Sequence, residues 1–151
     1  MDFMTAVKTC YSKYATFSGR AARSEFWWFV LFIMGMNFIL TFVDSFLFGT
    51  VTTMPGGFEA QTSMPVFSGL FLLASFLPNI SVIVRRLHDT DRSGWWYWIV
   101  LVPVIGIILL IVWLATRGTP GENRFGPDPL GGSTFDGGDL GASDIPRVSN
   151  D

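Results

Sequence analysis

The chain has 151 residues, of which 50% are hydrophobic, 16% aromatic and only 15% charged, and its mean hydropathy is +0.44. Soluble domains carry roughly 25% charged residues, so this chain has too little polar surface to cover its apolar side chains in water. Its formal net charge of −2 gives no case for nucleic-acid binding. The composition excludes an ordinary water-soluble globule and indicates a membrane protein.

The first expected element is an amphipathic helix over residues 3–17. Its apolar side chains fall within an arc of about 120°, with Thr and Lys residues opposite. Such a helix either lies along the lipid headgroups or packs on the membrane spans. Cys10, on the apolar face, is the chain's single cysteine, so a disulfide framework and a cysteine metal cluster are excluded.

Three apolar windows follow, at residues 26–48, 66–84 and 95–115. Each is close to the roughly 20 residues that a helix needs to cross a bilayer. The predicted fold class is an all-α integral membrane protein, with three transmembrane helices after an N-terminal interfacial helix in one domain, residues 1–129. We expect residues 49–65 to form a turn-rich loop. The Gly/Asp-rich tail, residues 130–151, is expected to be disordered.

Basic residues predict the orientation. Four precede the first window and three lie in residues 85–94, whereas residues 49–65 contain none. The positive-inside rule then places the N-terminus in the cytoplasm and, with three spans, the C-terminus outside. Pro103 and Gly106 divide the third window, however, and a re-entrant hairpin there would return the tail to the cytoplasm. Both topologies remain open at this point.

Polar residues inside the first two windows share helix faces. Asn37 and Asp44 lie on one face, and Ser68, Ser75 and Asn79 lie on another. In antiparallel neighbours, the helical rise places Asn37 near the depth of Ser75, and Asp44 near that of Ser68. These residues either form hydrogen bonds between helices or line a polar pathway in which Asp44 ionises. The intramembrane candidates are Asn37, Asp44, Ser75 and Asn79.

Two arginine motifs flank the spans: the first covers residues 17–28 and the second covers residues 85–96. Each combines arginines with a Trp pair, which simple anchoring at the membrane surface already explains. A binding site for a lipid headgroup or a partner protein would give the Arg and Asp side chains an additional role. Arg20 and Arg23 would pair with Asp89 and Asp91, leaving Arg85 and Arg86 for a lipid phosphate. The candidate lipid or partner residues are Arg20, Arg23, Glu25, Trp27, Arg85, Arg86, His88, Asp89, Asp91, Arg92 and Trp95.

Catalysis has little support in these residues. His88, Asp89 and Asp91 could hold a metal or transfer protons, but one His without Cys is a poor zinc site. Ser93 lacks the glycines of a nucleophile elbow, and a phosphate-binding glycine loop is absent from the sequence. We therefore expect neither catalytic residues nor a metal or cofactor.

A third motif, residues 118–129, reads Gly-Thr-Pro-Gly-Glu-Asn-Arg-Phe-Gly-Pro-Asp-Pro and is expected to form an ordered cap at the membrane surface. Together with Gly-Arg-Ala-Ala-Arg-Ser-Glu-Phe-Trp from residue 19 and Arg-Arg-Leu-His-Asp-Thr-Asp-Arg-Ser from residue 85, it resembles the domain of unknown function 805 family. The resemblance covers residues 1–129 and leaves out the tail. It implies a YhaH-like bacterial inner-membrane protein without an assigned reaction.

The expected function is that of a small non-catalytic inner-membrane protein. It would assemble with itself or with another membrane protein, or bind anionic lipid at the cytoplasmic face. One alternative is an oligomeric transporter or channel for an ion or small solute, with Asp44 as its ionisable group. A metal-dependent membrane enzyme is a second alternative. Nucleic acid is not an expected partner.

Overall fold

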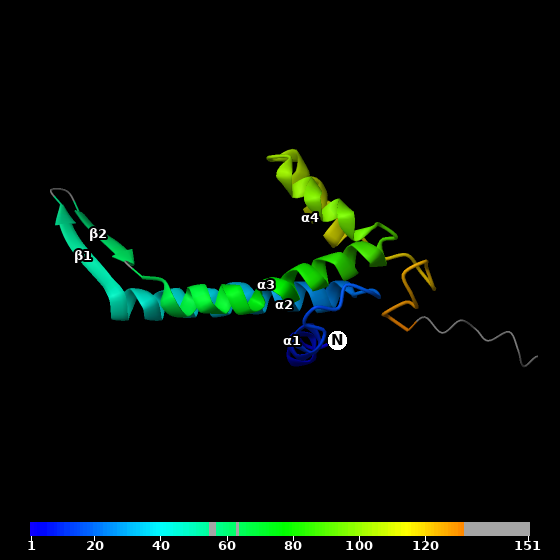
Figure 1. Ribbon diagram of the computed structural model, residues 1–151, viewed down its shortest axis with the longest axis horizontal. Coiled ribbons are helices and arrows are strands. Elements are labelled where there is room, and N and C mark those ends of the chain that lie inside the picture. The colour runs from blue at the N-terminus through cyan, green and yellow to red at the C-terminus, as the bar shows by residue number, and fades with distance from the viewer. Residues whose placement is uncertain (55–56, 63, 132–151) are drawn as a thin grey trace, which may run out of the picture.

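The computed structural model describes residues 1–54, 57–62 and 64–131, and these are mainly helical (Figure 1). The expectation of a disordered tail concerns residues that lie, from 132 onward, outside the described part of the chain. In chain order the elements are α1 (Phe3–Ser12), α2 (Arg23–Phe48), β1 (Gly49–Met54), β2 (Gly57–Thr62), α3 (Val66–Asp89), the 3₁₀ helix η1 (Gly94–Leu101) and α4 (Ile105–Ala115).

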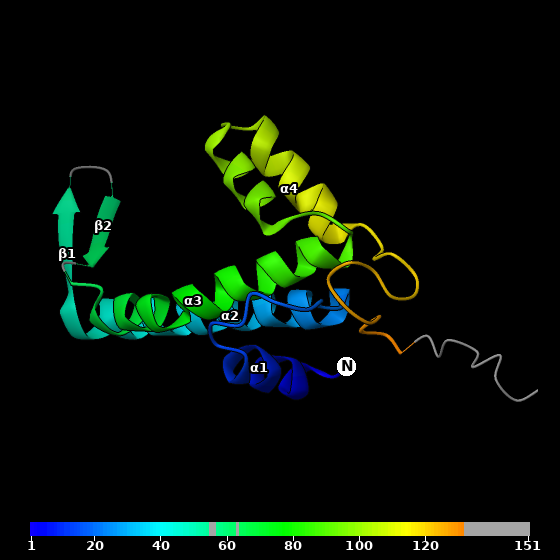
Figure 2. The same ribbon diagram turned by 45° about the vertical axis from the view of Figure 1, so that its right-hand side comes forward.

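The two long helices, α2 and α3, lie side by side and antiparallel along most of their length (Figures 1 and 2). They have 26 and 24 residues. At 1.5 Å of rise per residue each is longer than the roughly 30 Å hydrocarbon core of a bilayer. Both are apolar enough to cross a membrane. The predicted spans at 26–48 and 66–84 are thus confirmed as helices.

The burial pattern of this helix pair is the reverse of that in a soluble protein. Phe46 is 83% exposed and Phe38 75%, whereas the side chains of Arg85 and Arg86 are fully buried. Burying arginines while exposing phenylalanines would be costly in water. The same pattern is favourable when lipid chains cover the outer surface. α2 and α3 therefore have the surface of membrane helices rather than of buried core helices.

The link between α2 and α3 differs from the expected loop. β1 and β2 form an antiparallel hairpin, with Gly49 opposite Thr62 and Met54 opposite Gly57. It extends from the end of the helix pair away from the arginine motifs (Figure 2). Thr and Val fill much of β1, and such β-branched residues favour strands. That signal was missed because the glycines and Pro55 were read as turn formers only.

α1 crosses the helix pair at a steep angle, since Figure 1 shows it nearly end-on beside α2 and α3. The Tyr11 hydroxyl lies 2.8 Å from the Ser75 hydroxyl, and the Tyr14 hydroxyl donates to the Ala74 carbonyl at 2.7 Å. The Tyr11 ring also meets Phe29 edge to face at 5.6 Å. Of the two interpretations of this amphipathic segment, the structure shows the one in which the helix packs on the membrane-span candidates α2 and α3.

The helix α1 ends at Ser12, five residues earlier than expected. Lys13 has left the helical conformation, with φ −96° and ψ 41°, and its carbonyl accepts from the Thr16 N–H at 3.1 Å in a tight turn. The Ser81 hydroxyl of α3 lies 3.1 Å from the Lys13 carbonyl and 2.6 Å from the Thr16 carbonyl. This contact fastens the turn to α3 at a point where periodicity alone would extend the helix.

The expected continuous third span, residues 95–115, is wrong. The segment is a hairpin of η1 and α4, and Trp96 of η1 packs edge to face on Trp113 of α4 at 5.4 Å. Pro103 has no N–H to donate, and Val104 has a φ of +64°, which a helix cannot include. Gly106 closes the turn, since a Cβ there would overlap the Ile99 carbonyl. The hairpin expected as the alternative is the one observed.

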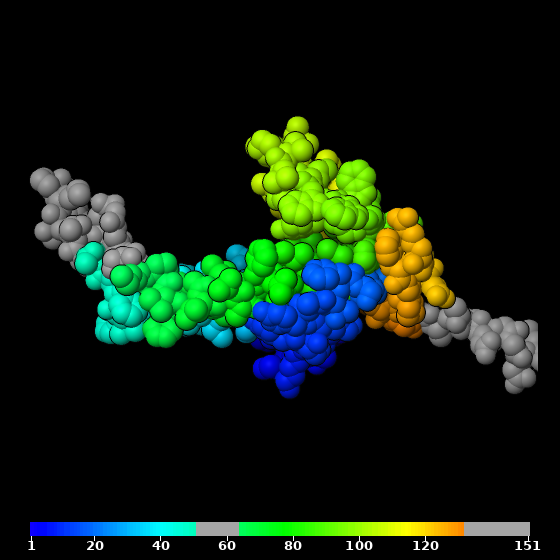
Figure 3. Space-filling view, viewed as in Figure 1, coloured from blue at the N-terminus to red at the C-terminus, as the bar shows by residue number. Residues whose placement is uncertain are grey.

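Both ends of this hairpin meet at the same end of the helix pair. The Thr119 N–H, beyond α4, donates to the carbonyl of Asp89 at 2.8 Å, before η1 begins. The N-terminal segment and residues 119–131 also lie next to each other there (Figure 3). The chain therefore leaves and returns at one end of the helix pair, whereas the expected three-span arrangement would carry it to the opposite end.

The hairpin turn generates a first prediction. Gly106→Ala should destabilise the protein by about 1–3 kcal/mol, because the new methyl group overlaps a backbone carbonyl. Gly69→Ala is the matched control, since Gly69 is helical with open space around it, and it should stabilise by about 0.5–1 kcal/mol. Apparent Tm values in mild detergent test both. Equal shifts in the two variants would contradict the hairpin.

Cys10 gives a second prediction, on the docking of α1. Its side chain is fully buried, and burial first, then the Glu25 carboxylate nearby, raises the pKa of the thiol to about 12. Maleimide at about pH 8 should therefore leave the folded protein unlabelled, because it reacts with thiolates. Ser12→Cys in a Cys10→Ser background, at an exposed position, should react readily. Rapid labelling of native Cys10 would show that α1 is not docked.

Candidate functional site: the charged end of the helix pair

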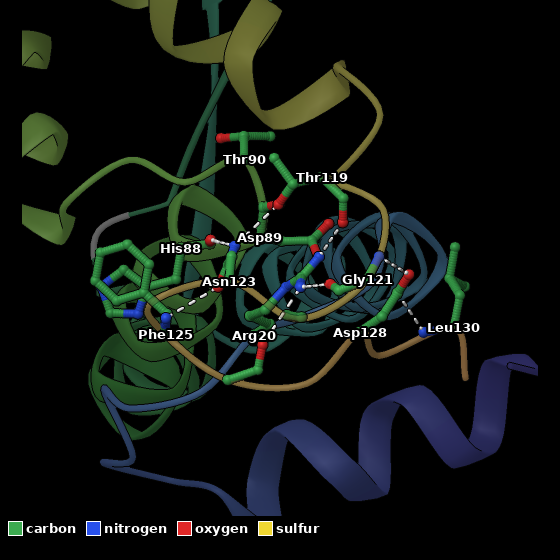
Figure 4. A network of polar contacts seen from close by, with 12 residues as sticks. Arg20, His88, Asp89, Thr90, Thr119, Gly121, Asn123, Phe125, Asp128 and Leu130 are labelled. Atoms are coloured by element: carbon green, nitrogen blue, oxygen red, sulfur yellow. Dashed lines mark hydrogen bonds and ion pairs between the residues drawn. The ribbon is translucent and has the colours of Figure 1, made fainter. Parts of the chain in front are cut away.

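The three sequence motifs converge at one end of the α2–α3 pair. The first motif leads into α2, the second forms the last turn of α3 and the link to η1, and the third follows α4. The Ala21 N–H donates to the Arg85 carbonyl at 3.0 Å, which joins the first two motifs through their backbones. Figure 4 shows the side chains that join all three.

Asp89, the last residue of α3, is shared by two arginines. Its Oδ1 accepts from Arg20 Nε at 3.0 Å and lies 2.9 Å from Arg20 Nη2, and its Oδ2 accepts from Arg86 Nη1. All three side chains are at least nine-tenths buried. Gly118 is required beside them, because a Cβ there would overlap the carboxylate. We call Asp89, Arg20 and Arg86 the Asp89 cluster.

Backbone carbonyls around the third motif satisfy the remaining donors of the two arginines. Arg20 donates to the carbonyls of Thr119 and Gly121, each at 2.5 Å. Arg86 donates through Nε to the Leu114 carbonyl at 2.9 Å and through Nη2 to the Thr116 carbonyl. Buried guanidinium groups are tolerated when their donors are paired in this way. The two arginines therefore hold the third motif in a fixed conformation, which agrees with its prediction as an ordered cap.

Further hydrogen bonds close the contact between the second and third motifs. Asn123 Nδ2 donates to the His88 carbonyl at 2.9 Å. The His88 ring stacks on Phe125 with 3.9 Å between centroids, and its Nδ1 lies 3.1 Å from the Gly19 carbonyl (Figure 4). His88 thus contacts the first and third motifs at once. These contacts give it a structural role.

A second buried ion pair lies beside the cluster. Arg85 Nη1 donates to Glu25 Oε1 at 2.6 Å, and both side chains are almost completely buried. The Cys10 thiol lies 3.8 Å from the same carboxylate oxygen. Within the described part of the chain, Arg85 Nε and Nη2 are buried without a partner. This pair links the start of α2 to α3 and to α1.

The pairing expected from sequence is correct in one case. Arg20 binds Asp89, as predicted. Asp91 instead pairs with Arg124, 3.0 Å away at the surface, and not with Arg23. Arg85 and Arg86 are not free for a lipid phosphate, because the fold buries them completely and uses them in ion pairs. The sequence could not rank these acceptors before the third motif was placed at this end.

Several candidate residues stay at the surface. Trp95 is 80% exposed, and the guanidinium of Arg92 lies over the Trp113 ring at 4.9 Å from its centroid. Arg23 and Trp27 line a pocket of about 430 Å³. Arg117 lines the same pocket and was missed as a candidate, since the three-span topology put it on the other side of the membrane. Its signal is a lone basic residue just before the third motif.

The intramembrane polar residues separate into different roles. Asp44 accepts from the Phe67 and Ser68 N–H groups at 2.9 and 2.8 Å and from the Ser68 hydroxyl at 2.7 Å, so it caps the first turn of α3. The predicted proximity of Asp44 to Ser68 is confirmed. Ser75 contacts Tyr11 rather than Asn37, whose Nδ2 is buried without a partner in the described chain. Asn79 is half-buried.

A metal centre finds no support in this geometry. Among the described residues there is no group of three or more His, Cys, Asp or Glu side chains that could hold a metal ion. Asp89 and Asp91 are each engaged by arginine, and His88 is held by Phe125 and Gly19. The arrangement is suited to holding segments together and to presenting its remaining cations.

Comparison with known proteins adds the family. The model of the family described as "Protein of unknown function (DUF805)" matches residues 14–127, which include the first two motifs and the third up to residue 127. The chain belongs to this family. The resemblance seen in the motifs is thereby confirmed.

Curated relatives are known from Escherichia coli strain K12. The chain is 41% identical to "Inner membrane protein YhaH" over 77% of its own length and 88% of the relative's. It is 43% identical to "Inner membrane protein YhaI" over 80% and 91%, and 28% identical to "Uncharacterized protein YiiR" over 75% and 85%. No solved structure matches the chain. As a DUF805 member it has uncharacterised relatives, so its chemistry must be argued from its own residues.

The cluster generates a third prediction. Asp89→Asn should destabilise the protein by about 3–5 kcal/mol, because two buried guanidinium groups lose their shared carboxylate. Asp91→Asn is the control. It removes an exposed ion pair worth about 0–1 kcal/mol, and Asn tolerates the φ of +57° at this position. Apparent Tm and expression level measure the difference. A similar loss in both variants would contradict the central role of Asp89.

Proposed function

We propose that this DUF805 member is a non-catalytic protein of the bacterial inner membrane that binds anionic lipid at the cytoplasmic face. In this proposal α2 and α3 cross the bilayer, the η1–α4 hairpin enters and leaves from one side, and both ends of the described chain are cytoplasmic. The observation that carries the proposal is the collection of basic side chains at one end of the helix pair. The names of YhaH and YhaI support the choice of membrane.

The end of the helix pair at which the three motifs meet carries a net positive charge. We define the basic end as residues 1–25 and 85–131. It contains nine Lys and Arg side chains and six Asp and Glu side chains, whereas residues 49–65 contain neither Lys nor Arg. The positive-inside rule favours the cytoplasm for such an end. The hairpin strengthens that argument, because it brings Arg117 and Arg124 to the side of the other basic residues.

A positive local surplus also fits an anionic partner better than the formal net charge of −2 suggests. The acidic residues of the tail and of the α2–β2 region account for the difference. Anionic lipids attract Lys and Arg near the cytoplasmic surface by about 1 kcal/mol per residue. The exposed cations of the basic end are placed where such headgroups lie. Lipid is therefore the partner class that this geometry favours.

The two alternative functions, a transporter or channel and a metal-dependent enzyme, both need residues that the fold engages in other contacts. A pathway through the membrane needs an ionisable Asp44, yet its carboxylate oxygens are used to cap α3. A metal enzyme needs His88 and its neighbouring acids, which are used in stacking and ion pairs. We therefore assign these groups to the fold and propose that the protein acts by binding.

A fourth prediction tests the topology. A fluorescent protein fused after residue 131 should fluoresce, and alkaline phosphatase fused at the same point should be inactive, because the first works inside the cell and the second outside. The same two reporters inserted between β1 and β2 should give the opposite result. An active phosphatase after residue 131 would overturn the proposed topology.

The lipid assignment has its own test. Native mass spectrometry of the protein released from mixed phosphatidylglycerol and phosphatidylethanolamine nanodiscs should show phosphatidylglycerol retained in excess over its share of the mixture. The same spectra report the oligomeric state and so test the expectation of self-assembly. Retention of the two lipids in proportion to the mixture would refute the lipid-binding function.

A further inference from the structure

Two arginines of the basic end are left without internal partners. Arg23 is the first residue of α2, and Arg117 lies two residues beyond α4. Both are exposed, and in the described part of the chain neither makes a hydrogen bond or ion pair. They line the same pocket of about 430 Å³, together with Ser24 and Trp27. They contrast with Arg20, Arg85 and Arg86, which are buried in ion pairs within the fold.

The Asp89 cluster holds these two arginines near each other. Arg86 donates to the Ala21 carbonyl at 3.3 Å, on one side, and to the Leu114 and Thr116 carbonyls on the other. One buried guanidinium thus fixes the backbone two residues before Arg23 and one residue before Arg117. A site held by such contacts does not need to be ordered again when a ligand binds.

The pocket is positive although a carboxylate lines it. That carboxylate is Asp89, whose two oxygens already bind Arg20 and Arg86. The charges of Arg23 and Arg117 are therefore not neutralised from within the pocket. Two arginines can hold a phosphate through several charge-assisted hydrogen bonds. The chemistry of this end of the pocket is that of a phosphate site.

An apolar groove continues from the phosphate site along α2. It is lined by Ser24, Trp27, Trp28, Val30, Leu31 and Met34, and it shares Ser24 and Trp27 with the first pocket. Trp27, Leu31 and Met34 are spaced four and three residues apart and so form one stripe of the helix. From Ser24 to Met34 the helix rises about 15 Å, which equals half the hydrocarbon thickness of a bilayer.

We propose that these two pockets form one binding site for an anionic diacyl phospholipid. Its phosphate lies between Arg23 and Arg117, and one acyl chain runs along the Trp27–Met34 stripe within a single leaflet. Trp27, at the junction, offers an indole of the kind that prefers the headgroup boundary. This inference rests on the proposed function, because it needs the basic end to lie at the lipid headgroups. It adds the residues and the lipid class.

The experiment compares charge removal inside and outside the site. The double variant Arg23→Gln/Arg117→Gln should retain less phosphatidylglycerol, relative to phosphatidylethanolamine, in native mass spectra from mixed nanodiscs. About fivefold is expected for each arginine. Lys8→Gln/Lys13→Gln is the charge-matched comparison, since it removes two exposed cations of the basic end, Lys8 in α1 and Lys13 directly after it, that lie outside both pockets. Its retention should fall clearly less than that of the arginine double variant. Equal apparent Tm values show that both double variants are folded.

The outcomes separate the site from the wider proposal. If the wild type shows no preference for phosphatidylglycerol, the proposed function fails. If the wild type shows the preference and both double variants lose it equally, the function stands and this site is overturned. Glycerol phosphate, added as a soluble headgroup, should not displace the lipid, because it lacks the chain that fills the groove. Displacement at equal concentration would show a free-phosphate site and would also overturn the proposal.

Discussion

The sharing of Asp89 between Arg20 and Arg86 is the interaction on which the charged end depends. The three residues come from the segment before α2 and from the last turn of α3, and the two guanidinium groups reach on to carbonyls between Leu114 and Gly121. A buried carboxylate with two cations leaves a positive charge, and carbonyl dipoles stabilise it. The cluster therefore cannot be completed until the chain returns from the hairpin, which couples the membrane topology to an ion-pair geometry.

That coupling explains why a short hairpin can stay in place although few of its side chains are buried. η1 has no buried residue among its eight, and α4 buries Gly106, Leu110 and Leu114. Lipid contact makes the remaining apolar surface favourable but does not choose a position for it. The position comes from both ends of the hairpin, where the Thr119 N–H and hydroxyl bind the Asp89 carbonyl at 2.8 and 3.0 Å. Directional hydrogen bonds therefore fix the position of the hairpin, which apolar burial alone does not.

Hydropathy and helical rise predicted α2, α3 and the depth match of Asp44 with Ser68, because these depend on residue type and spacing alone. The motifs also indicated Arg20 with Asp89. The path of residues 95–115 could not be read from hydropathy, since an apolar hairpin and an apolar span have the same composition. Val104 at positive φ and the approach of Gly106 to Ile99 decide it. The roles of Arg86 and Arg117 depend on that path and were missed with it, whereas Arg85 pairs with Glu25 of α2 independently of the hairpin.

The arginines beside the buried carboxylates thus fall into two classes. Arg20, Arg85 and Arg86 pair with Asp89 or Glu25 and are buried, and this pairing offsets much of their desolvation although Arg85 Nε and Nη2 lack partners in the described chain. Arg23 and Arg117 lie beside the same cluster, but its only carboxylate is already occupied. Neither makes an ion pair in the described chain, although the Asp128 carboxylate interacts electrostatically with Arg117. In the proposed function their counter-ion is lipid phosphate, and the internal pairing that saturates Asp89 leaves both arginines available to it.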